Sequence, residues 1–376
     1  MANIQSPLQV GKLALQHRVV LAPLTRFRAD DNLAPLPLVK EYYTQRASVP
    51  GTLLITEATF VSARASGYPN FPGIFNEAQI KAWREVTNAV HAKGCFIFCQ
   101  LIALGRVANP KVLAAQGYSV GSSSDLPVSE GSAVPKPLDE EEIQTYIADF
   151  AQAAKNSIEA GFDGVEIHGA NGYIIDQFTQ DTCNKRTDRW GGSIENRSRF
   201  GLEVAKAVTA AIGPERTGYR VSPWSPFQAM KMEDPQPQFT HLVRNLSKMG
   251  LAYLHVIESR ISGNDTVDGK PESTDWIVDA FDDAGAVILA GGFTPQSAKE
   301  TVENHKSRRV AIAFGRDYIS NPDLPFRVIN NIGLTPYNRA TFYKAKSPVG
   351  YIDYTNSPEY DAWASTKSKV SASAKC

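Results

Sequence analysis

Three side chains that can act together on a carbonyl compound lie within six residues of one another. His168 ends the apolar run Gly164–His168, and Asn171 and Tyr173 follow it closely. Imidazole and amide N–H groups can donate hydrogen bonds to one oxygen, and a phenol can supply a proton beside it. Taken singly, each residue is more readily explained as a buried histidine, a loop amide or a packed aromatic ring. Their grouping after a strand-like run favours a catalytic site.

Glycines and an arginine at two other strand-like runs indicate a phosphate site. Gly291 and Gly292 follow one run, and Gly315 and Arg316 follow the next run along the chain. Glycines let backbone N–H groups approach a phosphate, and an arginine can bind two of its oxygens. Two tight turns and a surface arginine are the alternative. No G-x-G-x-x-G motif is present, which disfavours a Rossmann-type dinucleotide site.

Other polar residues also stand at or inside apolar runs. Pro23 and Thr25 follow the first run, Gln100 ends the third, and Arg220 lies inside the fifth. An unpaired charge within a central strand is very costly, so Arg220 must face a counter-charge or an acceptor. An ion pair with a neighbouring glutamate is the alternative to a role in the site.

The alternation of short apolar runs with amphipathic segments predicts an α/β fold, a (β/α)8 barrel. Continuous β-branched runs are typical of parallel strands buried on both faces. Eight such units favour a closed barrel over a doubly wound sheet, and catalytic groups of a barrel gather where its strands end. The predicted strands are Arg18–Ala22, Thr52–Thr56, Cys95–Gln100, Gly164–His168, Gly218–Ser222, Tyr253–Ile257, Ala286–Ala290 and Val310–Phe314. The predicted helices include Asn76–Lys93, Asp139–Ala160, Ser193–Ala211, Gln236–Gly250, Ser273–Ala284 and Thr294–Asn304.

One domain is expected over residues 1–364. The polar segment 106–137 interrupts the third βα unit and is too long for a plain connection, so we predict a flap over the mouth of the site. A second loop, Ser259–Ser273, follows the sixth strand. The small polar residues of 365–376 predict a flexible tail.

Composition narrows the class of protein. Basic and acidic residues number 39 each, so no nucleic-acid or acidic-membrane partner is indicated. No run approaches the roughly 18 apolar residues of a membrane span, and no signal peptide is recognisable. Four scattered cysteines do not form a disulfide framework, and no cluster has zinc-site spacing. We expect a cytoplasmic enzyme with a small-molecule substrate and no metal, as a monomer or homodimer.

Five motifs together resemble the Old Yellow Enzyme family of FMN-dependent ene-reductases, in a consistent order from Leu8 to Tyr354. HGANGY followed by GGSIENR is the most specific part. The fungal branch that acts on ergot-alkaloid aldehydes is similar overall, which suggests secondary metabolism. The motifs are Ala22–Arg26 (APLTR), His168–Tyr173 (HGANGY), Asp188–Arg197 (DRWGGSIENR), Phe314–Arg316 (FGR) and Asn321–Leu324 (NPDL).

The resemblance implies a barrel that holds FMN non-covalently and uses NADPH to reduce the C=C bond of α,β-unsaturated carbonyl compounds. Thr25 would lie near the flavin C4 carbonyl, Gln100 at the pyrimidine edge and Arg220 at N1–C2. The other cofactor-binding residues implied are Pro23 and Gly291, with Gly292, Gly315 and Arg316 at the phosphate.

The resemblance also implies roles toward the substrate. His168 and Asn171 would bind the carbonyl oxygen, and Tyr173 would give a proton to the α-carbon after hydride reaches the β-carbon. Tyr343 would line the pocket from the C-terminal segment. Ile102 stands where many family members have tryptophan, which would reshape the substrate pocket. Gly292 stands where asparagine is frequent.

Four alternatives to a reductase stay open at this point. A redox-neutral flavin-dependent isomerase or cyclase would use the same residues. A flavin-free barrel, such as an aldolase, would need only the phosphate site. A serine hydrolase would use Ser119, because Gly117–Gly121 matches G-x-S-x-G, although that motif needs a strand before it and a helix after it. A flavin-binding protein without turnover is the fourth.

Overall fold

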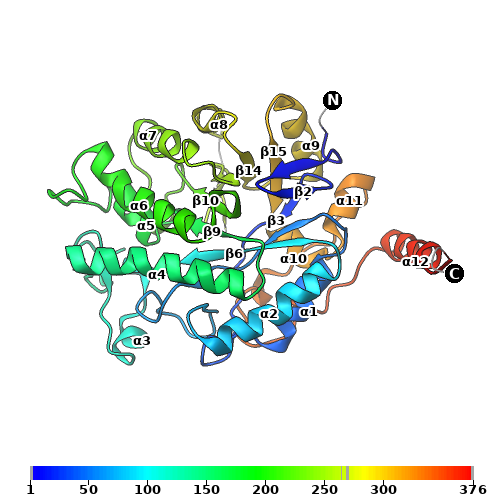
Figure 1. Ribbon diagram of the computed structural model, residues 1–376, viewed down its shortest axis with the longest axis horizontal. Helices are drawn as coiled ribbons and strands as arrows, with labels where there is room; N and C mark the ends of the chain where they lie inside the picture. The colour runs from blue at the N-terminus through cyan, green and yellow to red at the C-terminus, as the bar shows by residue number, and fades with distance from the viewer. Residues whose placement is uncertain (1–2, 264, 268–270, 374–376) are drawn as a thin grey trace.

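The protein folds as a closed barrel of eight parallel strands surrounded by helices (Figure 1). The computed structural model describes residues 3–263, 265–267 and 271–373. The strands pair in the order β4-β3-β15-β14-β11-β10-β9-β6, and pairing of β4 with β6 closes the ring, so the predicted barrel is confirmed. The strands are β3 (Val19–Leu21), β4 (Leu53–Ile55), β6 (Phe96–Ile102), β9 (Gly164–His168), β10 (Thr217–Val221), β11 (Tyr253–Ile257), β14 (Ala286–Ala290) and β15 (Val310–Phe314).

Two of the predicted helices begin at a residue whose side chain caps them. The Asp139 side chain accepts from the Glu142 N–H at 2.9 Å, and the Glu142 carboxylate accepts from the Asp139 N–H, which completes a capping box. Asn76 likewise accepts from the Gln79 N–H. The main helices are α1 (Pro37–Arg46), α2 (Glu77–His91), α4 (Glu140–Glu159), α6 (Ile194–Ile212), α7 (Gln236–Ser247), α8 (Asp275–Phe281) and α9 (Pro295–Asn304). Shorter helices are α3 (Pro110–Ala114), α5 (Ile174–Thr179), α10 (Arg316–Ser320) and α11 (Leu324–Asn330).

An N-terminal hairpin covers the amino end of the barrel. Its strands, β1 (Leu8–Val10) and β2 (Leu13–Leu15), pair antiparallel. Leu8, Val10 and Leu15 are buried in one cluster with side chains of the barrel strands, Phe98 and Ile288 among them. Burial of this apolar surface closes one end of the barrel. Functional groups are therefore confined to the other end.

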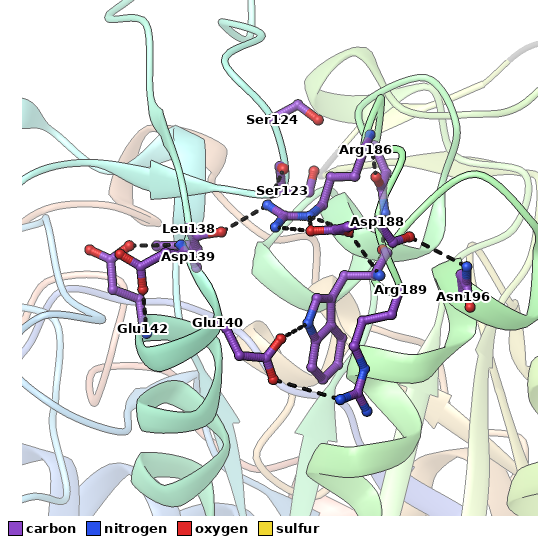
Figure 2. Close-up of polar contacts among 12 residues, drawn as sticks. Ser123, Ser124, Leu138, Asp139, Glu140, Glu142, Arg186, Asp188, Arg189 and Asn196 are labelled. Carbon is purple, nitrogen blue, oxygen red and sulfur yellow. Dashed lines mark hydrogen bonds and ion pairs between the residues drawn. The ribbon is translucent and has the colours of Figure 1, made fainter.

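The segment 106–137 lies between β6 and α4 and is tied to the loop after α5. It includes α3 and the short strands β7 (Gly121–Ser122) and β8 (Lys136–Pro137), which pair with each other. Arg186 donates to the carbonyl oxygens of Ser123 at 3.0 Å and Leu138 at 2.8 Å, and it pairs with Asp188 (Figure 2). The stretch that begins at Asp188 is thus part of a structural clamp.

Three buried arginines hold the C-terminal segment against the barrel. Arg26 Nε donates to the Phe342 carbonyl at 3.0 Å, and Arg28 Nε donates to that of Ser347 at 3.0 Å. Arg46 Nη2 donates to the Tyr351 carbonyl at 3.2 Å. Because such charges are costly to bury without acceptors, these bonds fix the path of the segment.

The chain ends in helix α12 (Pro358–Ser373), which projects from the barrel (Figure 1). This helix includes residues 365–373 of the predicted tail, where the side chains of residues 365–367 are exposed. Residues 374–376 lie outside the described part, and the flexibility of the tail stays a prediction. Among the described residues, no helix is long and apolar enough to cross a membrane.

Candidate active site

A cavity of about 870 Å³ opens where the strands end. Its volume is within the range of small-molecule and cofactor sites. Ten of the thirteen predicted site residues line it: Pro23, Thr25, Asn171, Tyr173, Arg220, Gly291, Gly292, Gly315, Arg316 and Tyr343. Gln100, Ile102 and His168 are not among the lining residues.

The loop after β9 holds the predicted catalytic residues in a constrained backbone. Asn171 has φ of +58°, and its N–H donates to Ser222 Oγ at 2.7 Å. The Gly172 N–H donates to buried Asp176 at 2.8 Å. Asparagine tolerates this left-handed conformation better than most residues. The two bonds therefore fix the turn that presents Asn171 and Tyr173 to the cavity.

His168 is a neutral ring in contact with Tyr173. The two ring centroids are 4.9 Å apart in an edge-to-face arrangement. Burial, helped by the charge of Arg220, lowers the pKa of His168 to about 3. Its Nδ1 accepts the Ala170 N–H at 3.3 Å, so the ring proton resides on Nε2. Burial raises the pKa of Tyr173 to about 12, which keeps its hydroxyl protonated at neutral pH.

A buried polar layer lies next to the cavity on neighbouring strands. Gln100 donates to Glu166 at 2.7 Å, and His255 Nδ1 lies 2.8 Å from the other carboxylate oxygen. Burial alone would raise the pKa of Glu166, but His255 and Arg220 hold it below its ordinary value. Arg220 pairs in register with both His168 and His255. The predicted counter-charge of Arg220 is therefore Glu166, and Arg220 also lines the cavity.

The glycine-rich strand ends form one wall of the cavity. Gly291 and Gly292 have φ of +130° and +64°. A Cβ on Gly315 would lie 3.2 Å from Leu24, which leaves little room for any side chain there. Arg316 also lines the wall, and its Nη2 donates to Thr266 at 3.1 Å. Backbone groups of this kind beside an arginine suit a phosphate.

Ile102 does not reach the cavity. It is fully buried in a cluster that contains Phe60 and Phe71, whose rings stack at 4.3 Å. Leu104, two residues further, lines the cavity instead. The prediction that Ile102 forms part of the pocket is thus not supported by its position.

The mouth of the cavity is built by segments other than the predicted flap. None of residues 106–137 lines the cavity, so the flap stays a prediction without support from the lining. The loop Ser259–Ser273 contributes several lining residues, although residues 264 and 268–270 lie outside the described part. Tyr343, on the segment held by the arginines, packs edge-to-face on Phe27 at 5.8 Å.

Arg260 and Gln228 are among the lining residues that were not predicted from the sequence. Arg260 donates to the Gly291 carbonyl at 3.0 Å and lies 4.4 Å over the Phe293 ring. Gln228 lines the cavity close to Tyr173. Arg260 follows the sixth strand closely, and that position was the signal available in the sequence.

The serine hydrolase alternative lacks its structural context. Ser119 is exposed between α3 and β7, so a helix precedes it and a strand follows. The nucleophile motif requires the reverse order. Across the described residues, no group of three or more His, Cys, Asp or Glu is arranged to hold a metal ion.

Comparison with known proteins defines the class of enzyme. The model of the NADH:flavin oxidoreductase / NADH oxidase family matches residues 3–334. Chanoclavine-I aldehyde reductase fgaOx3 of Penicillium roqueforti (strain FM164) is 56% identical over 362 residues, which cover 96% of this chain and 98% of that protein. A probable inactive reductase, easA, of Epichloe festucae var. lolii is 53% identical over 368 residues, 96% of each chain.

The structure of Old Yellow Enzyme from Pichia sp. AKU4542 is also similar. It has a TM-score of 0.88 and 36% identity, and the match covers 95% of this chain and 94% of that chain. The chain therefore belongs to the NADH:flavin oxidoreductase family, as a member of its Old Yellow Enzyme group. It is an oxidoreductase with a barrel fold.

The cavity fits the flavin mononucleotide that this family implies. Arg220 Nε is buried and has no hydrogen-bond partner in the part of the chain that the structure describes. A cationic donor of this kind suits the polar edge of a flavin ring. Gly292, Gly315, Arg316 and Arg260 supply the open backbone and positive charge that suit its single phosphate.

Proposed function

We propose that the protein is an NADPH-dependent ene-reductase that reduces the C=C bond of α,β-unsaturated aldehydes and ketones. The observation that carries this proposal is the donor set after β9, in which a neutral histidine, an amide and a protonated phenol lie together. The bound FMN would supply the hydride for the substrate β-carbon, after reduction by NADPH. The names of relatives as aldehyde reductases support a substrate of this class.

The protein's own residues would polarise the carbonyl group. His168 Nε2 and the Asn171 side-chain amide would donate hydrogen bonds to its oxygen, on which negative charge develops in the transition state. Because the pKa of His168 is about 3, the ring binds as a neutral donor throughout the physiological range. This arrangement leaves the α-carbon to be protonated by a separate acid.

Tyr173 would be that acid. With a pKa of about 12 it is protonated at neutral pH, and it lines the cavity beside Asn171. The apolar side chains Phe27, Phe71 and Leu104 are among the lining of the cavity. We therefore expect good turnover of enals and enones that carry an apolar substituent. Such substrates would fit a role in a biosynthetic pathway.

The test begins with the purified protein. Acid precipitation should release one FMN, and each saturated product formed from cyclohexenone or cinnamaldehyde should consume one NADPH. Tyr173→Phe should slow oxidation of the reduced enzyme by about 10²- to 10⁴-fold. Tyr118→Phe changes an exposed tyrosine outside the cavity and is the matched control.

The outcomes separate the alternatives. Product formation without net NADPH consumption would show a redox-neutral isomerase or cyclase. Flavin binding without conversion of any enone or enal would show a flavoprotein without this activity. A colourless protein that releases no flavin would exclude both flavin-dependent functions.

A further inference from the structure

The chain that leaves β11 packs tightly against the glycine turn that follows β14. The Glu258 N–H donates to the Ala290 carbonyl oxygen at 2.8 Å. A Cβ on Gly291 would lie 3.3 Å from the Cβ and from the backbone N and O of Glu258, and Gly291 has φ of +130°. The close packing and the positive φ both favour glycine at this position. The turn belongs to the cavity wall that suits a phosphate.

Arg260 joins these two strand ends. Its Nε donates to the Gly291 carbonyl oxygen at 3.0 Å, and its Nη2 pairs with the Glu258 carboxylate. The guanidinium carbon lies 4.4 Å from the centroid of the Phe293 ring, which is a cation–π distance. Only 28% of the Arg260 side chain is exposed. Three separate contacts therefore hold the guanidinium in one orientation on the cavity wall.

The bond to the Gly291 carbonyl also determines where the next amide points. This carbonyl and the Gly292 N–H belong to one planar trans peptide unit, in which the two groups point in opposite directions. Gly292 has φ of +64° and lines the cavity. None of the described residues accepts a hydrogen bond from its N–H. A backbone donor of this kind, on the same wall as Arg316, suits a phosphate oxygen.

The orientation of this peptide unit needs support from outside the turn. Glycine populates both signs of φ, so two adjacent glycines impose little restriction of their own. If the unit turned over, its carbonyl oxygen would face the phosphate in place of its N–H. Such a change would break the bond between Arg260 and the Gly291 carbonyl, and Arg260 therefore opposes it.

We propose that Arg260 is a positioning residue for the FMN phosphate, and this inference rests on the flavin of the proposed function. Arg260 acts through the Gly291 carbonyl: by holding that oxygen, it keeps the Gly292 N–H directed at the phosphate. Two nitrogens of the guanidinium are already engaged by Gly291 and Glu258. The contribution assigned to Arg260 is therefore the orientation of the peptide unit.

The test compares two flavins that differ only in the phosphate. Full-length protein, freed of its flavin, is titrated with FMN and with riboflavin, and the change in flavin fluorescence gives each Kd. Arg260→Met keeps an unbranched side chain and removes the donor. It should raise the Kd for FMN by about 10- to 100-fold, the effect of one hydrogen bond to a charged group. The Kd for riboflavin should change by less than about twofold, because riboflavin lacks the group on which Arg260 acts.

Two further variants serve as controls. Arg308→Met removes an arginine of similar exposure, 30%, which pairs with Asp279 and Asp282 and does not line the cavity. Its Kd for each flavin should equal that of wild type. Arg260→Lys keeps a positive charge but lacks the planar guanidinium that reaches two partners at once. It should therefore resemble Arg260→Met in its Kd for FMN.

The ³¹P resonance of bound FMN gives a second measurement that needs no turnover. At FMN concentrations that saturate both proteins, this resonance should differ between Arg260→Met and wild type, because the phosphate loses an oriented N–H donor. Arg308→Met should leave the resonance in place. Binding of riboflavin with unchanged Kd verifies that each variant is folded.

The outcomes separate the positioning role from the proposed function. If wild type binds no flavin, both are wrong. If wild type binds FMN but converts no enone or enal, the proposed function alone is wrong. Equal weakening of FMN and riboflavin binding by Arg260→Met, an unchanged Kd for FMN, or an unmoved ³¹P resonance would overturn the positioning role. Wild-type affinity of Arg260→Lys for FMN would also overturn it, because charge alone would then suffice.

Discussion

Replacement of Arg186 by alanine should lower the free energy of unfolding by about 3–5 kcal/mol. The Arg186 side chain is only 12% exposed, and its guanidinium bridges three segments (Figure 2). It donates to the backbone carbonyls of Ser123 and Leu138, two buried residues, and it pairs with Asp188 at 2.6 Å. Removing it leaves two carbonyl oxygens without their charged donor.

The magnitude follows from these contacts. Hydrogen bonds to a charged donor contribute about 1.5–3 kcal/mol each, and we take the lower half of that range because solvent can enter the gap. The pair with Asp188, whose side chain is 48% exposed, adds about 0–1 kcal/mol. Arg186→Lys keeps the charge but loses the planar fork, so it should fall between alanine and wild type.

Arg189→Ala is the matched control, because Arg189 is close in the sequence and carries the same charge. Its side chain is 60% exposed and lies 3.9 Å from Glu140, a pair worth about 0–1 kcal/mol. Urea unfolding of the flavin-saturated protein, followed by circular dichroism, gives the comparison. If Arg186→Ala costs no more than Arg189→Ala, the carbonyls find other donors, and the motif around Asp188 is not a structural clamp.

Two further predictions concern buried residues around the cavity. Ile102→Trp should destabilise the protein by about 1–3 kcal/mol through overpacking. It should also alter the stereochemistry of the product, measured by chiral chromatography, less than Leu104→Phe does. A larger change in stereochemistry for Ile102→Trp would contradict the buried placement of Ile102. Burial raises the pKa of Asp176 from 3.8 to about 7. The folded protein therefore binds this proton more tightly than the unfolded chain, and the stabilisation present at low pH is lost as pH rises through about 7. Asp176→Asn should flatten the stability–pH curve across that window in urea titrations, and an unchanged slope would show that Asp176 ionises normally.

Local sequence determined the barrel and most of its catalytic end. All eight strands of the barrel were predicted from short apolar runs. The N-terminal ends of α2 and α4 were predicted at Asn76 and Asp139. These features depend on side chains a few residues apart, so they are readable from the chain alone. Helix α1 was missed because its buried face, Val39, Tyr42, Tyr43 and Arg46, has helical spacing but consists mostly of phenols and a guanidinium, which look polar in the sequence.

Which of Ile102 and Leu104 lines the cavity could not be predicted from the local sequence. Both side chains are apolar and stand two residues apart, so alternation in a strand gives them the same face. The stacked rings of Phe60 and Phe71 enclose Ile102, while the chain leaves β6 before Leu104 and presents Leu104 to the cavity. Only the packing of segments distant in sequence separates the two residues.

The composition of the buried polar layer next to the cavity likewise depends on the strand register. Sequence placed Arg220 inside a strand and required a partner, but it did not identify Glu166, 54 residues earlier. Parallel pairing sets Gln100 beside Glu166 and Arg220 beside His255. The sequence gives the type of each residue. The electrostatic environment of that residue depends on which strands become neighbours when the barrel closes. The sequence by itself therefore determined which groups could do chemistry, and the tertiary structure decided which of them face the cavity and in what state of protonation.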